Sequence, residues 1–210
     1  MARKAGKSAA EEPPLKLFYI FYNEERWNNW LRTLSEADFE GDGGDDVPEG
    51  IAMLYAFSED ITLSVLKIVR LWQNERFKAD EALQKIDDIE AIVLSELPDG
   101  PLVELVGPVQ ESVLVLFAAC RRFIAGDYDK DVKALIKRGR TLAAQGADET
   151  LEVAAEIGAA VIGGAACCAR YVKDDIEDPT LFDDWLVEIE TMGEAMKSLK
   201  NFDEEPGESS

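Results

Sequence analysis

The sequence predicts an all-α fold of about seven helices, bundle-like and in a single domain, and three observations carry that prediction. Apolar residues recur at spacings of three and four along most of the chain. Clusters of glycine and proline separate these periodic stretches. Only residues 15–22 could pass for a strand, and a single strand has no partner in the chain with which to form a sheet. We therefore read this stretch as an extension of the first helix or as an extended lead-in.

The helix boundaries follow from residues that start or stop helices. Asn23 can cap the first helix, and Asp80 the third, through side-chain oxygens. Gly107-Pro108 is expected to begin the fourth helix, and Gly126 to end it in a left-handed conformation. The first helix ends before an acidic, glycine-rich loop at 36–50. The later helices are predicted at 50–75, 80–97, 109–125, 129–145, 148–172 and 180–199.

The expected domain covers residues 15–200 and is flanked by two short tails. Residues 1–14 are basic to polar and end in two prolines, while residues 201–210 are acidic. Tails of this composition are expected to be mobile.

Charge and histidine content exclude several classes of function. The chain has 43 Asp and Glu against 22 Lys and Arg, a formal net charge of -21, and no histidine. Direct nucleic-acid binding is not expected, because phosphates are engaged by clustered basic residues. Without histidine, a Ser-His-Asp triad, a Cys-His pair and a histidine-bearing zinc site are ruled out. We expect no cofactor.

The three cysteines and the longest apolar run both favour a cytoplasmic protein. Cys120, Cys167 and Cys168 are too few for an iron–sulfur cluster and are expected to be reduced. The longest charge-free apolar run, residues 157–169, is shorter than the roughly 18 residues of a spanning helix. The basic N-terminus lacks the apolar stretch of a secretory signal, so neither a membrane nor export is expected.

Acidic residues three apart supply the alternative function, an all-α nucleotide pyrophosphohydrolase that uses Mg²⁺. Glu149 and Glu152 form one such pair, and Asp175 and Asp178 form another. Mg²⁺ prefers oxygen ligands and needs no histidine. However, acidic pairs at this spacing are common in so acidic a chain, and solvated helix ends are the reading we prefer. Cys120 has two arginines beside it but lies on an apolar face, which favours a core role over catalysis.

Two further patterns point either to the core or to a partner. Gly158, Gly163 and Gly164 lie in a small-residue stretch that allows a close helix crossing, either inside the domain or in a homodimer. Six of the 18 aromatic residues lie between residues 18 and 30. Trp27 is expected to be core, whereas Tyr19 and Tyr22 are the candidates for contact with a partner.

A family resemblance rests first on the segment FYNEERWNNWL, residues 21–31. Residues 89–96 and the stretch 112–124, with its Phe117, Cys120 and Arg122, carry it further. Through these segments, and over about residues 17–199, the chain resembles an archaeal family known as domain of unknown function 2150. The family includes halophiles and methanogens, so it implies a lineage, while no activity or site comes with it. The acidic charge has two open explanations: adaptation to a cytoplasm rich in potassium salt, where screening removes most self-repulsion, or the binding of a partner.

Taken together, these observations predict a non-enzymatic, cytoplasmic helical protein that acts through protein–protein contacts. We expect an adaptor or regulator whose partner has a basic surface. The acidic loop at 36–49 and the acidic run at 174–190 are the segments expected to meet that partner. The partner, the oligomeric state and the biological process are not specified by the sequence.

Overall fold

The computed structural model describes residues 21–40, 47–145, 149–166 and 179–201, and these residues form helices without any strand. The all-α prediction is confirmed. The elements are α1 (Glu24–Glu36), α2 (Glu49–Gln73), α3 (Ala79–Val93), α4 (Pro101–Ala125), α5 (Val132–Ala143), α6 (Thr150–Ile162), α7 (Leu181–Ser198) and a final 3₁₀ turn, η2 (Leu199–Asn201). The predicted tail at 1–14 and the tail residues from 202 onward lie outside the described residues.

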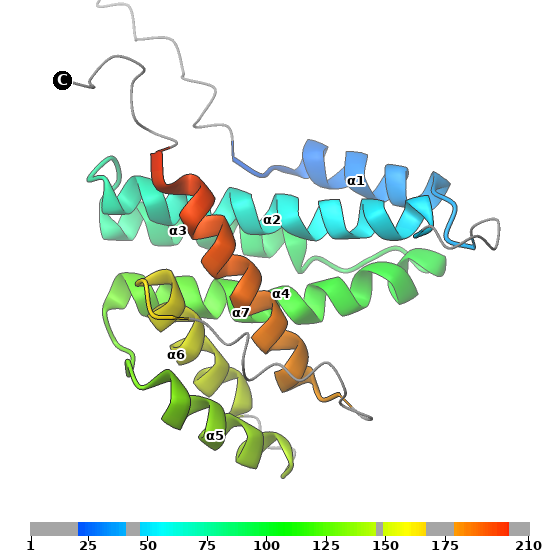
Figure 1. Ribbon diagram of the computed structural model, residues 1–210. Coiled ribbons are helices and arrows are strands. Elements are labelled where there is room, and N and C mark those ends of the chain that lie inside the picture. Colours follow the sequence, from blue (N-terminus) through cyan, green and yellow to red (C-terminus); the bar gives the residue numbers. More distant parts are fainter. Residues whose placement is uncertain (1–20, 41–46, 146–148, 167–178, 202–210) are drawn as a thin grey trace, which may run out of the picture.

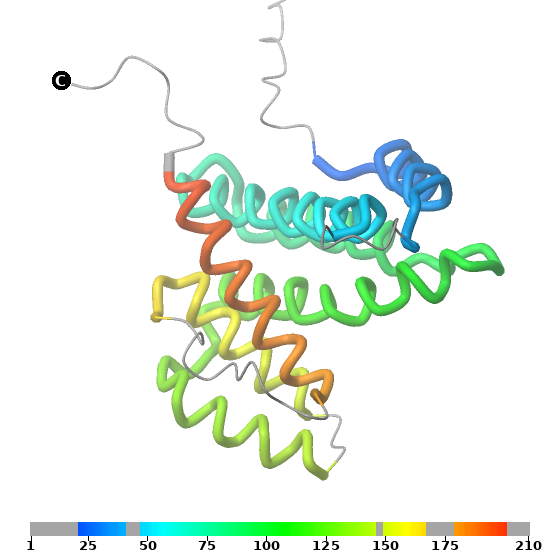
Figure 2. The backbone as a smooth tube through the Cα atoms, turned by 45° about the vertical axis from the view of Figure 1, so that its right-hand side comes forward, coloured from blue at the N-terminus to red at the C-terminus, as the bar shows by residue number. Residues whose placement is uncertain are grey.

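Helix α4 is the centre of the arrangement. It packs against α1, α2, α3, α6 and α7. In Figure 1 the helices α1 to α3 lie on one side of α4, and α5 and α6 lie on the other. Helix α7 crosses α4 obliquely and connects the two groups, and the first half of α4 projects beyond that crossing in both views (Figures 1 and 2).

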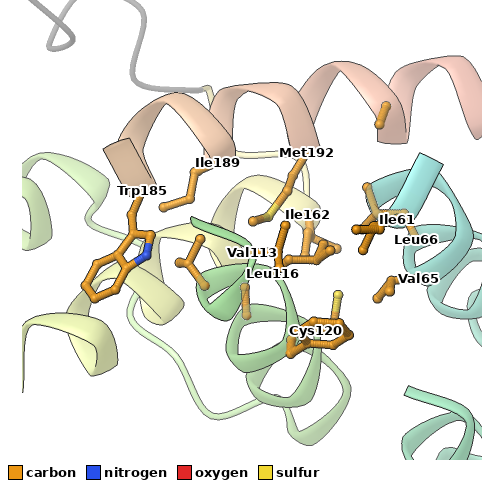
Figure 3. Close-up of a cluster of buried hydrophobic side chains, with 14 of the residues drawn as sticks. Ile61, Val65, Leu66, Val113, Leu116, Cys120, Ile162, Trp185, Ile189 and Met192 are labelled. Carbon is orange, nitrogen blue, oxygen red and sulfur yellow. The ribbon is translucent and has the colours of Figure 1, made fainter. Parts of the chain in front are cut away.

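The core forms where α2, α4, α6 and α7 meet. Figure 3 shows the side chains of Ile61, Leu116, Cys120, Ile162 and Met192 converging from these four helices. All of them are buried. Because each helix contributes one apolar stripe, the burial follows the periodicity of the sequence and holds the helices at fixed positions.

Several predicted helix ends are confirmed by their hydrogen bonds. The Asn23 side chain accepts a hydrogen bond from the backbone N–H of Arg26 at 2.9 Å and begins α1. Gly126 ends α4 with φ of 72°. Thr180 begins α7 in a capping box with Asp183, whose side chain accepts from the Thr180 backbone N–H at 3.0 Å. Such caps satisfy backbone groups that a helix end otherwise leaves unpaired.

Other predicted ends were wrong. Helix α3 begins after Lys78, so Asp80 lies in its first turn instead of capping it, and the helix stops at Val93, before the predicted residue 97. Helix α4 begins at Pro101, and Pro108 lies inside it. Proline is favourable at the first position, which Pro101 takes. Pro108 is exposed and lacks an N–H, so it cannot donate the usual helical hydrogen bond to the carbonyl of Glu104.

Helix α6 also ends earlier than predicted. The backbone N–H of Ala165 donates to the carbonyl of Ala160 at 2.9 Å, and that of Gly164 donates to Val161 at 2.9 Å. Gly164 has φ of 97°, a left-handed conformation that glycine adopts without strain. This pair of bonds is the Schellman motif that closes helices. The predicted continuation at 167–172 lies outside the described residues.

By length and composition, α4 is also apolar enough to span a membrane. It has 25 residues, with a mean hydropathy of 1.6 in its most apolar window. Core helices of water-soluble proteins pass the same test, and α4 packs against five other helices. Its buried residues include Val113, Leu116, Phe117 and Cys120. Packing therefore accounts for the apolar residues on the buried face of α4, which makes up 39% of that window.

Candidate functional site

A groove lies between the first halves of α2, α4 and α7. Its volume is about 730 Å³, which is within the range of roughly 300–1,000 Å³ that ligand sites occupy. We call it the acidic groove, and the residues that line it are Leu54, Tyr55, Ser58, Glu59, Glu104, Leu105, Pro108, Val109, Glu111, Ser112, Leu181, Asp184, Val187, Glu188 and Thr191.

Large apolar side chains are exposed along this groove. Tyr55 is 73% exposed, Val187 51% and Leu181 40%. Within the described residues, the other exposed large apolar side chains are Val47 and Val103. Three of the five thus line one groove, and a concentration of apolar surface rimmed by polar groups is typical of an interaction site.

The polar lining carries charge of one sign. Glu59 comes from α2, Glu104 and Glu111 from α4, and Asp184 and Glu188 from α7, whereas no lysine or arginine of the described residues lines the groove. Burial raises the pKa of Asp184, and Asp183 beside it adds to that rise. Since apolar walls and carboxylates alternate around one opening, the groove is suited to a ligand that is both apolar and cationic.

Glu188 differs from the other four carboxylates because its side chain accepts a hydrogen bond from a buried residue of α2. The Thr62 hydroxyl, which is fully buried, donates a hydrogen bond to Oε1 of Glu188 at 3.0 Å. Burial raises the pKa of the Glu188 carboxyl, and the hydrogen bond from Thr62 offsets part of that effect. The side chain is therefore partly desolvated and fixed in orientation at the wall of the groove.

The aromatic residues near the N-terminus lie mainly in the core. Trp27 is 5% exposed, as predicted, with its ring centroid 5.5 Å from that of Phe57. Tyr22 was expected to face outward for a partner, but it is also 5% exposed and packs edge-on against Trp27. Its hydroxyl has no hydrogen-bond partner in the described part of the chain, and burial raises its pKa. Tyr19 lies outside the described residues.

Asp60 of α2 holds this aromatic cluster in place. Its carboxylate accepts from Nε of Arg26 at 2.7 Å and from the indole N–H of Trp30 at 2.8 Å. The guanidinium also lies 5.6 Å from the centroid of the Tyr22 ring. These contacts hold α1 against α2, which is why the aromatic cluster closes inward and not toward a partner.

The three candidate glycines do not share one surface. Gly158 is buried in α6, and a Cβ atom there would lie 2.6 Å from the Cβ of Ala119 in α4. It therefore serves the internal crossing of α6 and α4. Gly163 and Gly164 are exposed and form the end of α6. Self-association through all three glycines would require Gly158 to leave the core. Self-association through the exposed Gly163 and Gly164 remains a prediction.

The acidic pairs and the cysteine are likewise placed by the fold. Glu152 forms an ion pair with Arg122, and Glu149 precedes α6, while Asp175 and Asp178 lie outside the described residues. Within the described ranges, no group of three or more Asp, Glu or Cys side chains could hold a metal ion. Cys120 is fully buried, which raises the pKa of its thiol to about 12 in spite of Arg121 nearby. A thiol with so high a pKa is not a nucleophile at neutral pH.

The groove itself was not foreseen from the sequence. The acidic run at 174–190 was singled out and includes Asp184 and Glu188, but its residues 174–178, like 41–46 of the acidic loop, lie outside the described residues. The contributions of α2 and α4 were missed because they are far from this run in the sequence. Tyr55 and Leu181 were interpreted as parts of apolar helix faces, and Val187 was not singled out.

Comparison with known proteins identifies a family. Residues 20–205 match the family model DUF2150, described as an uncharacterized protein conserved in archaea. Neither the curated proteins nor the solved structures contain a match. The match extends over most of the chain and over all seven helices, from before α1 to beyond α7. The chain is therefore a member of the archaeal DUF2150 family.

Proposed function

We propose that this protein is a non-enzymatic, cytoplasmic adaptor or regulator that binds a basic amphipathic segment of another protein in the acidic groove. The observation that carries the proposal is the combination in one opening of exposed Tyr55, Leu181 and Val187 with five carboxylates, while no basic residue in the described part of the chain lines that opening. A helix with one apolar and one basic face matches this pattern, because its apolar side chains would cover the exposed groups while its cations face the carboxylates.

The overall charge supports the same partner. A net charge of -21 attracts a basic segment at long range and raises its association rate. Apolar contact is still needed for specificity, since attraction alone is lost at high salt. Aromatic residues such as Tyr55 commonly contribute most of the binding free energy at interfaces.

The test uses a defined probe. A fluorescein-labelled peptide of about 18 residues, or five helical turns, carries leucine on one face and lysine on the other. Fluorescence anisotropy reports its affinity for the parent protein, and a peptide with glutamate in place of lysine serves as the charge control. We expect binding of the basic peptide only, with part of the affinity kept at about 1 M salt.

Two matched variants separate groove binding from general attraction. Val187→Asp introduces a charge into the groove, and Val47→Asp introduces the same charge at a valine that is exposed outside it. Both variants become more acidic, so attraction alone predicts equal or tighter binding. Docking in the groove predicts at least about a tenfold loss for Val187→Asp, and less than about a twofold change for Val47→Asp. Equal affinities for the two variants would refute the proposal.

A further inference from the structure

Within the acidic groove, the geometry points to a subsite for a single cationic side chain. We propose that Glu188, held by Thr62, receives the ammonium or guanidinium group of one lysine or arginine of the partner. This inference rests on the proposed function, because it assigns a role to one residue of the same groove.

Three other half-buried carboxylates, Asp60, Glu90 and Glu156, each have an arginine partner of the kind that Glu188 lacks. Asp60 accepts from Arg26 at 2.7 Å. Glu90 accepts from Arg121 at 3.0 Å. Glu156 lies 3.8 Å from Arg138. In each of these cases an arginine of the same chain compensates for the partial burial of the carboxylate.

Glu188 has no ion pair with any described residue, and its hydrogen bond is to a neutral hydroxyl. The charged groups that line the groove from each of the three helices are also acidic. They are Glu59 of α2, Glu104 and Glu111 of α4, and Asp184 of α7. A partly desolvated carboxylate among like charges is a group that a cation from outside would stabilise.

The hydrogen bond from Thr62 fixes the orientation of the Glu188 carboxylate in the subsite. Thr62 is fully buried on α2, and its hydroxyl holds Oε1 of Glu188 in place. Glu188 itself still lines the groove. A carboxylate has acceptor capacity for several donors, so an ammonium or guanidinium group can bind without displacing the threonine. Val187 precedes Glu188 on α7 and is exposed, which places an apolar contact next to the cation. A lysine or arginine side chain fits both contacts, because its apolar stem can pack against Val187 while its charged end binds Glu188.

The raised pKa of Glu188 gives the proposed subsite a pH dependence. Burial raises the pKa of Glu188 and so disfavours the charged form of its carboxyl group. A cation binds that charged form, so its binding must overcome this effect of burial. Affinity for the basic peptide should then fall as the pH is lowered through the raised pKa of Glu188. This dependence should be weaker in a variant without the carboxyl group, although Asp184, whose pKa is also raised, still contributes.

The test compares two variants of α7 that each lose one negative charge. Glu188→Gln keeps an oxygen that can accept from Thr62, so the fold should be retained, as circular dichroism and melting would verify. Glu194→Gln is the control, because Glu194 is exposed on α7 and does not line the acidic groove. We expect Glu188→Gln to weaken binding of the leucine–lysine peptide at least about tenfold, and Glu194→Gln to change it less than about twofold.

A peptide series then identifies the cation. Each lysine is replaced in turn by norleucine, which keeps most of the stem and removes the charge, and an arginine series distinguishes the two cations. One replacement should weaken binding to the parent protein but not to Glu188→Gln, since coupled groups do not contribute additively. If Glu188→Gln binds like Glu194→Gln while Val187→Asp still loses affinity, the subsite is wrong and the groove stands. If Val187→Asp binds like Val47→Asp, the proposed function itself fails.

Discussion

Replacing Trp27 by alanine is the perturbation whose cost follows most directly from the structure. Trp27 is 5% exposed and lies between the rings of Tyr22 and Phe57, with centroids 6.5 Å and 5.5 Å away. A buried tryptophan removes roughly 150–250 Å² from water. At about 25 cal/mol per Å², this burial amounts to about 4–6 kcal/mol.

The expected loss in the free energy of unfolding is smaller than that upper figure, about 3–5 kcal/mol, because the unfolded chain already buries part of the ring and the site relaxes. For a chain of this size, each kcal/mol lowers the melting temperature by about 2–4 °C. Trp27→Ala should therefore melt roughly 6–20 °C below the parent, as measured by circular dichroism at 222 nm with urea denaturation as an independent assay.

The matched control is Tyr55→Ala, which removes an aromatic ring that is 73% exposed on α2. Its stability should remain within about 0.5 kcal/mol of the parent. A Trp27→Ala protein as stable as the parent, together with an unfolded Tyr55→Ala protein, would show that the buried and exposed faces have been assigned the wrong way round.

Three other predictions concern the crossing of α6 and α4, the groove carboxylate and the net charge. Gly158→Leu should lower stability by about 1–3 kcal/mol or more, because even a Cβ atom there lies 2.6 Å from Ala119, and light scattering should show an unchanged mass. A carboxyl whose pKa is raised by folding stabilises the fold below its ordinary pKa and loses that contribution as the pH rises through the raised value. Glu188→Gln should therefore have a higher melting temperature than the parent at neutral pH. If this difference in melting temperature does not shrink at acidic pH, the raised pKa of Glu188 is contradicted. With a net charge of -21, the melting temperature should rise between about 10 mM and about 1 M potassium chloride, and a flat profile would count against self-repulsion.

The sequence was sufficient for the fold class and for most helix positions, because local chemistry sets these features. Asn23 caps α1 and Gly126 ends α4 through groups within a few residues of each end. Pro108 was misread for the same local reason, since proline usually marks a helix start. Its tolerance inside α4 depends on its exposed position, which only the packed structure defines.

The groove could not be predicted in the same way, because it is a property of three helices together. Tyr55, Glu111 and Glu188 are separated by many residues, and an amphipathic pattern does not state which neighbours will leave part of a stripe uncovered. Tyr22 illustrates the reverse error. Its ring was expected to contact a partner, but it is covered by Trp27 and by the guanidinium of Arg26.

The central claim is that a basic amphipathic segment docks between α2, α4 and α7. Chemical-shift mapping by NMR of the isotopically labelled protein, titrated with the leucine–lysine peptide, tests this claim most directly. The account predicts that the largest shifts in amide signals cluster at Tyr55, Leu105, Val187 and Glu188, which line the groove, while those of Val47 and Glu194 change little. Shifts spread evenly over acidic residues of all helices, or centred away from the groove, would contradict it.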